Sequence, residues 1–207
     1  MTKYVLPGIV MLTLSAIIGC SGQPSRIEAP AIDPSGAASQ AMELYDADSN
    51  GALSEEELKK CPAILSALDI YDTNADKAVT PDEIATRLQR LLDERNGLLM
   101  LHADVILNNK PLSGATIKFI PEAIVADAIK PAQGQTDSSG RCMPAVSAED
   151  SPVSGRAVQA MQPGLYRVEI THASQSIPAR FNTDSELGVD VSYRQMDTGI
   201  HFDLTSR

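Results

Sequence analysis

The chain contains two related twelve-residue runs, Asp46–Glu57 (DADSNGALSEEE) and Asp72–Glu83 (DTNADKAVTPDE). In both runs an oxygen-bearing side chain stands at the first, third, fifth, ninth and twelfth positions. Ca²⁺ is a hard cation that prefers six to eight oxygen ligands at flexible distances, and a twelve-residue loop with this spacing can wrap around it. The two runs therefore predict a pair of calcium-binding loops.

The first run resembles the loop of the EF-hand family at its constrained positions. The resemblance implies side-chain oxygens at positions one, three and five, a backbone carbonyl at position seven, a direct or water-mediated contact at position nine, and a bidentate glutamate at position twelve. Gly51 stands at the sixth position, where the sharp turn needs a positive φ. The implied ligands are Asp46, Asp48, Asn50, Ala52, Ser54 and Glu57.

The second run keeps each type of ligand but has Lys77 where the family has glycine. A left-handed conformation costs a residue with a Cβ about 1 kcal/mol, and a positive charge near the ion opposes binding. We therefore predict up to two bound Ca²⁺ ions, with the second site weaker than the first. The implied ligands of the second site are Asp72, Asn74, Asp76, Ala78, Thr80 and Glu83.

Helix signals accompany both loops. Ser54-x-x-Glu57 and Thr80-x-x-Glu83 have capping-box spacing, and Pro81 suits the first turn of a helix, so each exit helix is expected to begin inside its loop. The pattern predicts an exit helix to about residue 95 and an entering helix after residues 61–62. Their apolar stripes are Ile84, Leu88, Leu91 and Leu92, and Ile64, Leu65, Leu68 and Tyr71.

Leu53 and Val79, at the eighth positions, are expected to pair as a short two-stranded link between the loops. The loops begin 26 residues apart, so the helices between them must be short and a wide calcium-driven opening is disfavoured. The alternative for this region is a solvated acidic helix–turn–helix that binds no metal. Two copies of the loop pattern in register favour the metal site.

The pattern changes from helical spacing to alternation after residue 97. Leu99, Leu101, Ala103, Val105 and Leu107 share one face of a predicted strand, and polar turns such as 137–140 separate further short strands. Several short strands with polar turns predict an antiparallel β-sandwich. The expected fold class is therefore α+β and multidomain, with a small α-helical EF-hand pair at residues 37–97 and a β-sandwich at residues 98–207.

The second half resembles the carboxypeptidase regulatory-like, transthyretin-like domain of exported bacterial lipoproteins. The matching segments are Lys110–Ala115, Gly134–Asp137, Pro163–Val168 and Ile177–Pro178, whereas Cys142 and the irregular stretch 146–162 depart from the family pattern. The resemblance implies a non-catalytic module used for packing or for contact with a protein or glycan. Its glycines and prolines also have a plain explanation as turn formers.

The amino-terminal segment has the pattern of an export signal. Lys3 precedes an apolar run from Val5 to Ile18, and Ile17-Ile18-Gly19-Cys20 resembles the bacterial lipobox, which implies lipidation of Cys20. Residues 1–19 are then a signal peptide and 20–36 a lipidated cysteine with a flexible tether. The resemblance implies an exported, membrane-anchored lipoprotein of the bacterial envelope; the alternative is an ordinary secretory signal with an incidental cysteine.

Composition excludes some function classes. The net charge of −10 argues against nucleic acid, which selects basic surfaces. His102, His172 and His201 are far apart in sequence, and no serine has a nucleophile-elbow pattern, so we do not expect an enzyme. Cys61 and Cys142 either form a disulfide after export or remain free thiols.

We expect a calcium-binding, membrane-tethered surface lipoprotein with a structural or interaction role, and a protein or glycan partner. Two alternatives remain open. One is a calcium-responsive sensor, and the other is an accessory subunit of an envelope hydrolase.

Overall fold

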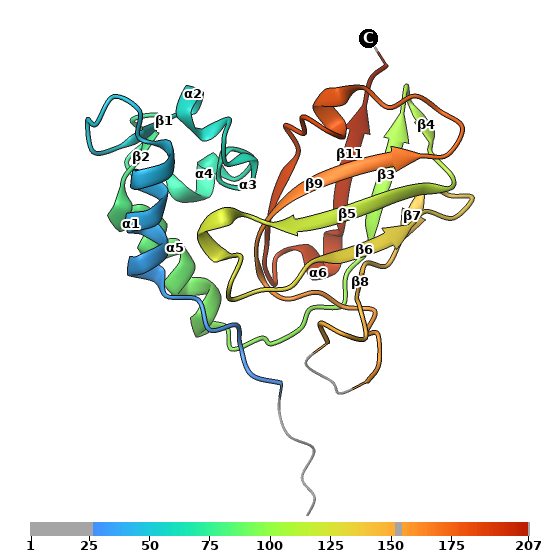
Figure 1. Ribbon diagram of the computed structural model, residues 1–207, viewed down its shortest axis with the longest axis horizontal. Coiled ribbons are helices and arrows are strands. Elements are labelled where there is room, and N and C mark those ends of the chain that lie inside the picture. Colours follow the sequence, from blue (N-terminus) through green and yellow to red (C-terminus); the bar gives the residue numbers. More distant parts are fainter. Residues whose placement is uncertain (1–26, 152–154, 207) are drawn as a thin grey trace, which may run out of the picture.

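A computed structural model describes residues 27–151 and 155–206. Figure 1 shows a group of helices on one side and two β-sheets on the other. This arrangement confirms the predicted α+β fold class. The predicted signal peptide, residues 1–19, and Cys20 lie outside the described residues. Within the described ranges, no helix combines the length and the apolar character needed to cross a membrane.

Two longer helices, α1 (Pro34–Tyr45) and α5 (Pro81–Asp93), pack side by side, and the shorter elements lie between them in the sequence. Helix α1 offers a face of small buried residues, which lets the larger side chains of α5 approach closely. The buried residues of this contact are Ala37, Ala38 and Ala41 on α1 and Ile84, Leu88 and Leu91 on α5.

The helices between α1 and α5 are short, as predicted, and each of them is a single turn. The helix that begins at Pro62 ends before Ser66, and a second one begins at Leu68. The predicted entering helix is therefore divided into two short helices. The elements in order are β1 (Leu53–Ser54), α2 (Glu55–Leu58), α3 (Pro62–Leu65), α4 (Leu68–Tyr71) and β2 (Ala78–Val79).

The end of the predicted tether is folded against the helices. Ile32 is 7% exposed, and Asp33 caps α1 by accepting a hydrogen bond from the Ser35 amide (3.2 Å). Pro34 occupies the first turn of α1, where its missing N–H costs nothing. Among the described residues of the tether, 27–36, the structure therefore has buried and helical positions where we expected flexible coil.

The larger sheet has five antiparallel strands in the order β10-β9-β5-β6-β8. Ile117 of β5 pairs with Ile170 of β9, and Phe119 pairs with Val168, so alternate residues of both strands face the core. The strands are β5 (Ala115–Pro121), β6 (Ala132–Gln135), β8 (Ala145–Val146), β9 (Gly164–His172) and β10 (Gly188–Val191).

The smaller sheet has the order β11-β3-β4, with β7 also paired to β3. Strands β3 and β11 are parallel, because helix α6 brings the chain back to the end of the sheet at which β3 begins. The Ile200 amide at the start of β11 donates to the His102 carbonyl, just before β3 (2.9 Å). The bounds are β3 (Ala103–Leu107), β4 (Lys110–Pro111), β7 (Arg141–Cys142), α6 (Gln195–Thr198) and β11 (Ile200–Leu204), with single 3₁₀ turns η1 (Ala123–Val125) and η2 (Ala179–Phe181).

The two sheets share one core. The ring of Phe119 lies 6.3 Å from the ring of Tyr166 within the larger sheet and 6.3 Å from the ring of Phe202 on β11 of the smaller sheet. Buried apolar residues continue from this core into the helices, so a single cluster contains both Ile64 of α3 and Val168 of β9. The helical region is therefore packed on the larger sheet, chiefly through α3 against β9 and β10.

Candidate metal centre

The two predicted loops lie next to each other because β1 and β2 pair antiparallel. Leu53 is opposite Val79 and Ser54 is opposite Ala78, which confirms the predicted link at the eighth positions. Both apolar side chains are fully buried. This pairing holds the seventh to ninth residues of each loop in a fixed relation to the other loop.

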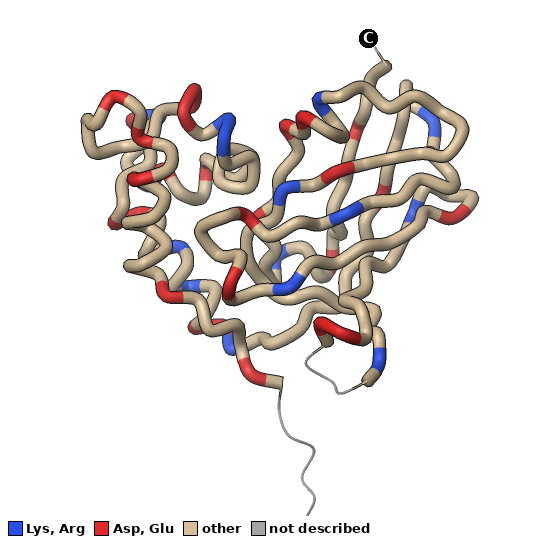
Figure 2. Tube along the Cα trace, in the orientation of Figure 1, with Lys and Arg blue, Asp and Glu red and all other residues tan. Residues whose placement is uncertain are grey.

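The first loop gathers three carboxylates. Ligand oxygens of Asp46, Asp48 and Glu57 all lie within 4.8 Å of one another. Oxygens that each lie 2.3–2.6 Å from one Ca²⁺ are separated by at most about 5 Å, so these carboxylates fit around a single ion. Within the described ranges this is the one group of three or more His, Cys, Asp or Glu side chains that are so close. Figure 2 shows the acidic residues of the loop region.

Backbone amides of the same loop hold these side chains in place. Asp46 accepts hydrogen bonds from the amides of Asn50 (3.2 Å) and Gly51 (3.0 Å), and the Asn50 side-chain oxygen accepts from the Ala52 amide (2.9 Å). Gly51 has φ of +87°, the turn for which glycine was expected at this position. Backbone N–H groups within the loop therefore fix the orientation of the Asp46 and Asn50 side chains.

Glu57 is the most enclosed of the three carboxylates, with 9% of its surface exposed. The amide and hydroxyl of Ser54 donate to one of its oxygens (2.9 and 2.8 Å), and the Ala47 amide donates to the other (2.8 Å). These hydrogen bonds, chiefly those from Ser54, lower the pKa of Glu57 to about 2. The carboxylate is therefore ionised at neutral pH, as a calcium ligand must be. The Ser54 hydroxyl also accepts from the Glu57 amide, which completes the predicted capping box.

The second loop repeats this network. Asp72 accepts from the amides of Asp76 (3.1 Å) and Lys77 (2.8 Å), and Glu83 accepts from the amides of Thr73 (2.9 Å) and Thr80 (2.9 Å). Burial raises the pKa of Glu83, but the hydrogen bonds from Thr80 and Thr73 outweigh burial and leave it below the usual value. The second capping box is also formed, with Thr80 as the cap.

The two loops differ at the sixth and at the third position. Lys77 has φ of +67°, so a residue with a Cβ occupies the left-handed conformation that Gly51 adopts freely. At the third position the first loop has the carboxylate of Asp48, whereas the second has the uncharged side-chain amide of Asn74. The difference at the sixth position agrees with a weaker second site.

The remaining predicted ligands lie in the same loops. Asn50, Ala52 and Ser54 belong to the first loop, and the side-chain NH₂ group of Asn50 donates to Asp48 (3.0 Å). The second loop contains Asn74, Ala78 and Thr80, and the side-chain NH₂ group of Asn74 donates to Asp76 (2.8 Å). One contact was missed by the sequence analysis. The Thr73 hydroxyl donates to Glu83 (2.8 Å), and a hydroxyl at the second position of the loop was the available signal.

A second polar cluster lies on the smaller sheet. Asp104 accepts two hydrogen bonds from Arg141 (2.7 and 2.9 Å), and its Oδ2 lies 3.2 Å from Nδ1 of His201 and 3.8 Å from Nε2 of His102. Arg141 chiefly lowers the pKa of Asp104. The histidines are adjacent because β3 and β11 are neighbours. Arg141 therefore occupies both oxygens of Asp104, and the cluster is a salt bridge with two histidine rings beside it.

The two cysteines within the described residues are free and buried. Cys61 lies at the start of α3 and Cys142 lies on β7. Of the two alternatives left open by the sequence, the structure has the free thiols.

Comparison of the chain with protein-family models, with curated proteins and with solved structures gives no match. The site is therefore interpreted from its own geometry.

Proposed function

We propose that the chain is a calcium-binding, membrane-tethered surface lipoprotein whose role is structural or interactive. The observation that carries the proposal is the group formed by Asp46, Asp48 and Glu57 in a loop whose amides orient all three side chains. Oxygen ligands at this separation suit a hard divalent cation, and the flexible geometry of a twelve-residue loop suits Ca²⁺ better than the rigid octahedron of Mg²⁺. The second loop supports a second, weaker site.

The position of the loops supports a stabilising role for the ion. The first loop follows α1 and the second precedes α5, and these two helices pack against each other. An ion in either loop ties the end of one long helix to the short elements between them. Because binding to the folded state alone stabilises that state, Ca²⁺ at 100 times its dissociation constant adds about 2.7 kcal/mol per site.

A sensor that opens a groove is less well supported. The buried face of α5 packs against α1, and Arg87 of α5 forms an ion pair with Asp190 of the larger sheet. Opening the helical region would separate these buried contacts. We therefore favour a role in which calcium makes the region between the anchor and the sheets rigid. The sheets are then the surface that contacts a protein or glycan partner.

Isothermal titration of residues 21–207 with Ca²⁺ and with Mg²⁺ tests the metal site. Glu57→Gln is expected to remove the tighter site and Glu83→Gln the weaker site. Glu56→Gln is the matched control, because Glu56 adjoins Glu57 in the same loop but points to Lys59. A wild-type chain that takes up no Ca²⁺ at millimolar concentration overturns the proposal, as does a Glu56→Gln variant that loses as much affinity as Glu57→Gln.

Limited proteolysis tests the stabilising role. Removal of Ca²⁺ by a chelator is expected to increase cleavage within residues 37–95 in the wild type and in Glu56→Gln, but to change little in a variant that combines Glu57→Gln and Glu83→Gln. Equal cleavage of the wild type with and without Ca²⁺ contradicts a stabilising role even if the ion binds. Calcium-dependent retention on a hydrophobic resin, absent with Mg²⁺, would favour the sensor instead.

A further inference from the structure

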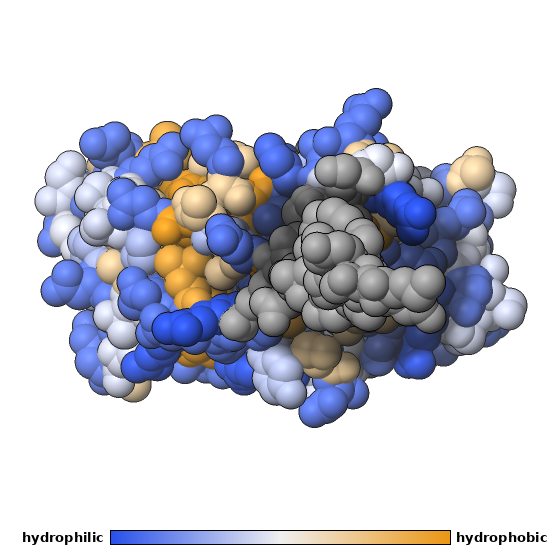
Figure 3. Space-filling model, turned by 90° about the horizontal axis from the view of Figure 1, so that it is seen from below, coloured by the Kyte–Doolittle hydropathy of each residue, from blue (hydrophilic) through white to orange (hydrophobic). Residues whose placement is uncertain are grey.

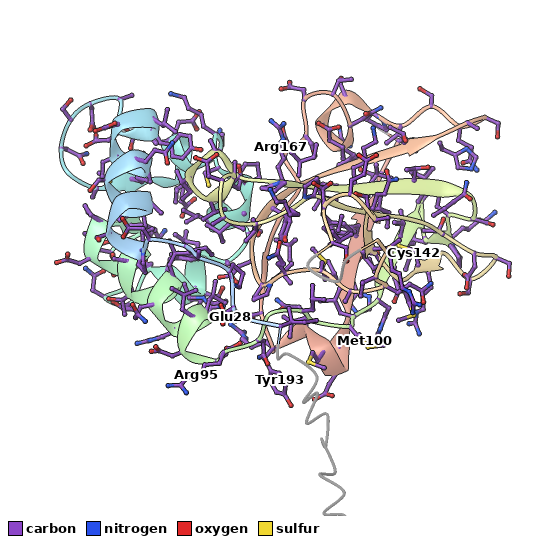
Figure 4. All side chains as sticks on the ribbon, turned by 60° about the horizontal axis from the view of Figure 1, so that its bottom comes forward. Glu28, Arg95, Met100, Cys142, Arg167 and Tyr193 are labelled. Carbon is purple, nitrogen blue, oxygen red and sulfur yellow. The ribbon has the colours of Figure 1, made fainter. Side chains whose placement is uncertain are left out.

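Three exposed apolar side chains lie on the side of the molecule where the described chain begins. Met100 is 62% exposed, Tyr193 58% and Met196 37%. We call the surface formed by these three residues the lower face. Figure 4 shows Met100 and Tyr193 on this side together with Glu28 and Arg95. Figure 3 views the molecule from below, where the apolar patch that it shows lies mainly over the helical region.

Specific contacts bring the segments of the lower face together. A Cβ on Gly97 would lie 2.5 Å from the carbonyl oxygens of Ile27 and Glu28, so the start of the described chain passes directly over the segment that leads to Met100. The Tyr193 amide donates to the Glu94 carboxylate (3.3 Å), which joins the segment before α6 to the end of α5. The lower face and the amino-terminal end of the described chain are therefore one region.

We propose that the lower face lies against the lipid bilayer, an inference that rests on the proposed lipid anchor at Cys20. Seven residue steps separate Cys20 from Ile27, and extended chain geometry limits this distance to about 25 Å. An anchor at Cys20 therefore holds this side of the molecule within reach of the lipid head groups.

The chemistry of the lower face suits the membrane interface. Tyrosine presents an apolar ring with a polar tip and is enriched at the level of the head groups, and methionine is a flexible apolar side chain. Arg95 and Arg194 are exposed near these residues, but so are Glu28 and Glu94. With both signs of charge present, contact depends on insertion of apolar side chains and not on attraction to anionic lipid. Three side chains are a small surface, so the contact acts together with the anchor.

The test uses the full chain, expressed with its leader in a bacterial host and reconstituted into phosphatidylcholine vesicles. A bimane fluorophore is attached at Met100→Cys or Tyr193→Cys, and quenching is measured with phosphatidylcholine carrying a nitroxide on carbon 5 of one acyl chain. Leu44→Cys is the matched control, because Leu44 is an exposed apolar residue (47%) near the opposite end of α1. Unsubstituted protein measures background labelling of the buried cysteines.

We expect at least threefold stronger quenching at positions 100 and 193 than at position 44, with little change between low and high salt. Equal quenching at all three positions in protein that is acylated at Cys20 overturns this inference and leaves the proposed function standing. Cross-linking of two chains through position 193, without quenching, would assign the lower face to a second copy and also overturn it. Absence of acylation by mass spectrometry overturns both the anchor and the inference.

Discussion

Arg87 of α5 and Asp190 of β10 form a buried ion pair that joins the helices to the larger sheet. Nε of Arg87 lies 2.8 Å from one oxygen of Asp190, and a terminal nitrogen lies 2.9 Å from the other. The two side chains are 7% and 1% exposed. The helix that carries Arg87 follows the second loop directly, so this pair links the metal-binding region to the sheet.

Arg87→Ala is expected to destabilise the protein by about 3–5 kcal/mol, because it leaves the Asp190 carboxylate buried without its partner. Denaturant unfolding measures the change. Arg141→Ala is the control, since Arg141 also forms a two-bond pair with a carboxylate but is 51% exposed, and it should cost at most about 1 kcal/mol. The double variant Arg87→Leu with Asp190→Leu should recover most of the loss. Equal effects of Arg87→Ala and Arg141→Ala would contradict a special role for the buried pair.

Gly188→Ala is expected to loosen the contact between α3 and β10. A Cβ at this position would lie 2.1 Å from the Pro62 carbonyl carbon and 2.2 Å from the Ala63 amide nitrogen, and backbone atoms cannot move aside cheaply. Overpacking of this kind costs about 1–3 kcal/mol. Hydrogen exchange should show faster exchange of the α3 amides in the variant. Unchanged exchange and unchanged stability would mean that α3 is not held against β10 as described.

Glu122 should make stability depend on pH. It is 5% exposed, and burial raises its pKa above the usual value of 4.5 although the Ala63 amide donates to it (3.1 Å). Because the folded pKa lies above the unfolded one, the protonated acid favours folding below pH 4.5, and this contribution is lost as the pH rises through the folded value.

Glu122→Gln removes this titration but keeps an oxygen for the Ala63 amide, so its stability relative to the wild type should increase from pH 4 to pH 7. Glu122→Ala leaves that amide without a partner and should cost about 1–3 kcal/mol. Unfolding of both variants at several pH values measures the difference, with Glu56→Gln as an exposed control. A constant difference between Glu122→Gln and the wild type across this range would refute the prediction.

Lys77→Gly should stabilise the second loop. Lys77 has φ of +67°, and glycine adopts such an angle without the cost imposed by a Cβ. Lys77→Ala removes the same charge but keeps the Cβ. We expect both variants to bind Ca²⁺ more tightly at the second site, and Lys77→Gly alone to gain about 1 kcal/mol in unfolding free energy relative to Lys77→Ala. Equal stability of the two variants would show that the backbone conformation is not the source of strain.

Several features of the candidate site were predictable from the sequence. Asp46, Asp48 and Glu57 are within twelve residues of one another, so one short loop brings their carboxylates together. The capping boxes were predicted for the same reason, whereas the pairing of Leu53 with Val79 was predicted because both stand at the eighth position of matching loops. The helix between Pro62 and Tyr71 was predicted less well, because its apolar stripe does not reveal the break at Ser66.

Local sequence alone therefore determines the two loops, their caps and the change from helices to strands, since these depend on spacing within a few residues. The packing of α3 on β10, the pairing of Arg87 with Asp190 and the parallel register of β3 and β11 depend on the folded chain. Arg87 and Asp190 are 103 residues apart, and nothing near either residue specifies its partner. Such contacts are selected by the free energy of burying whole surfaces together, which no short pattern encodes.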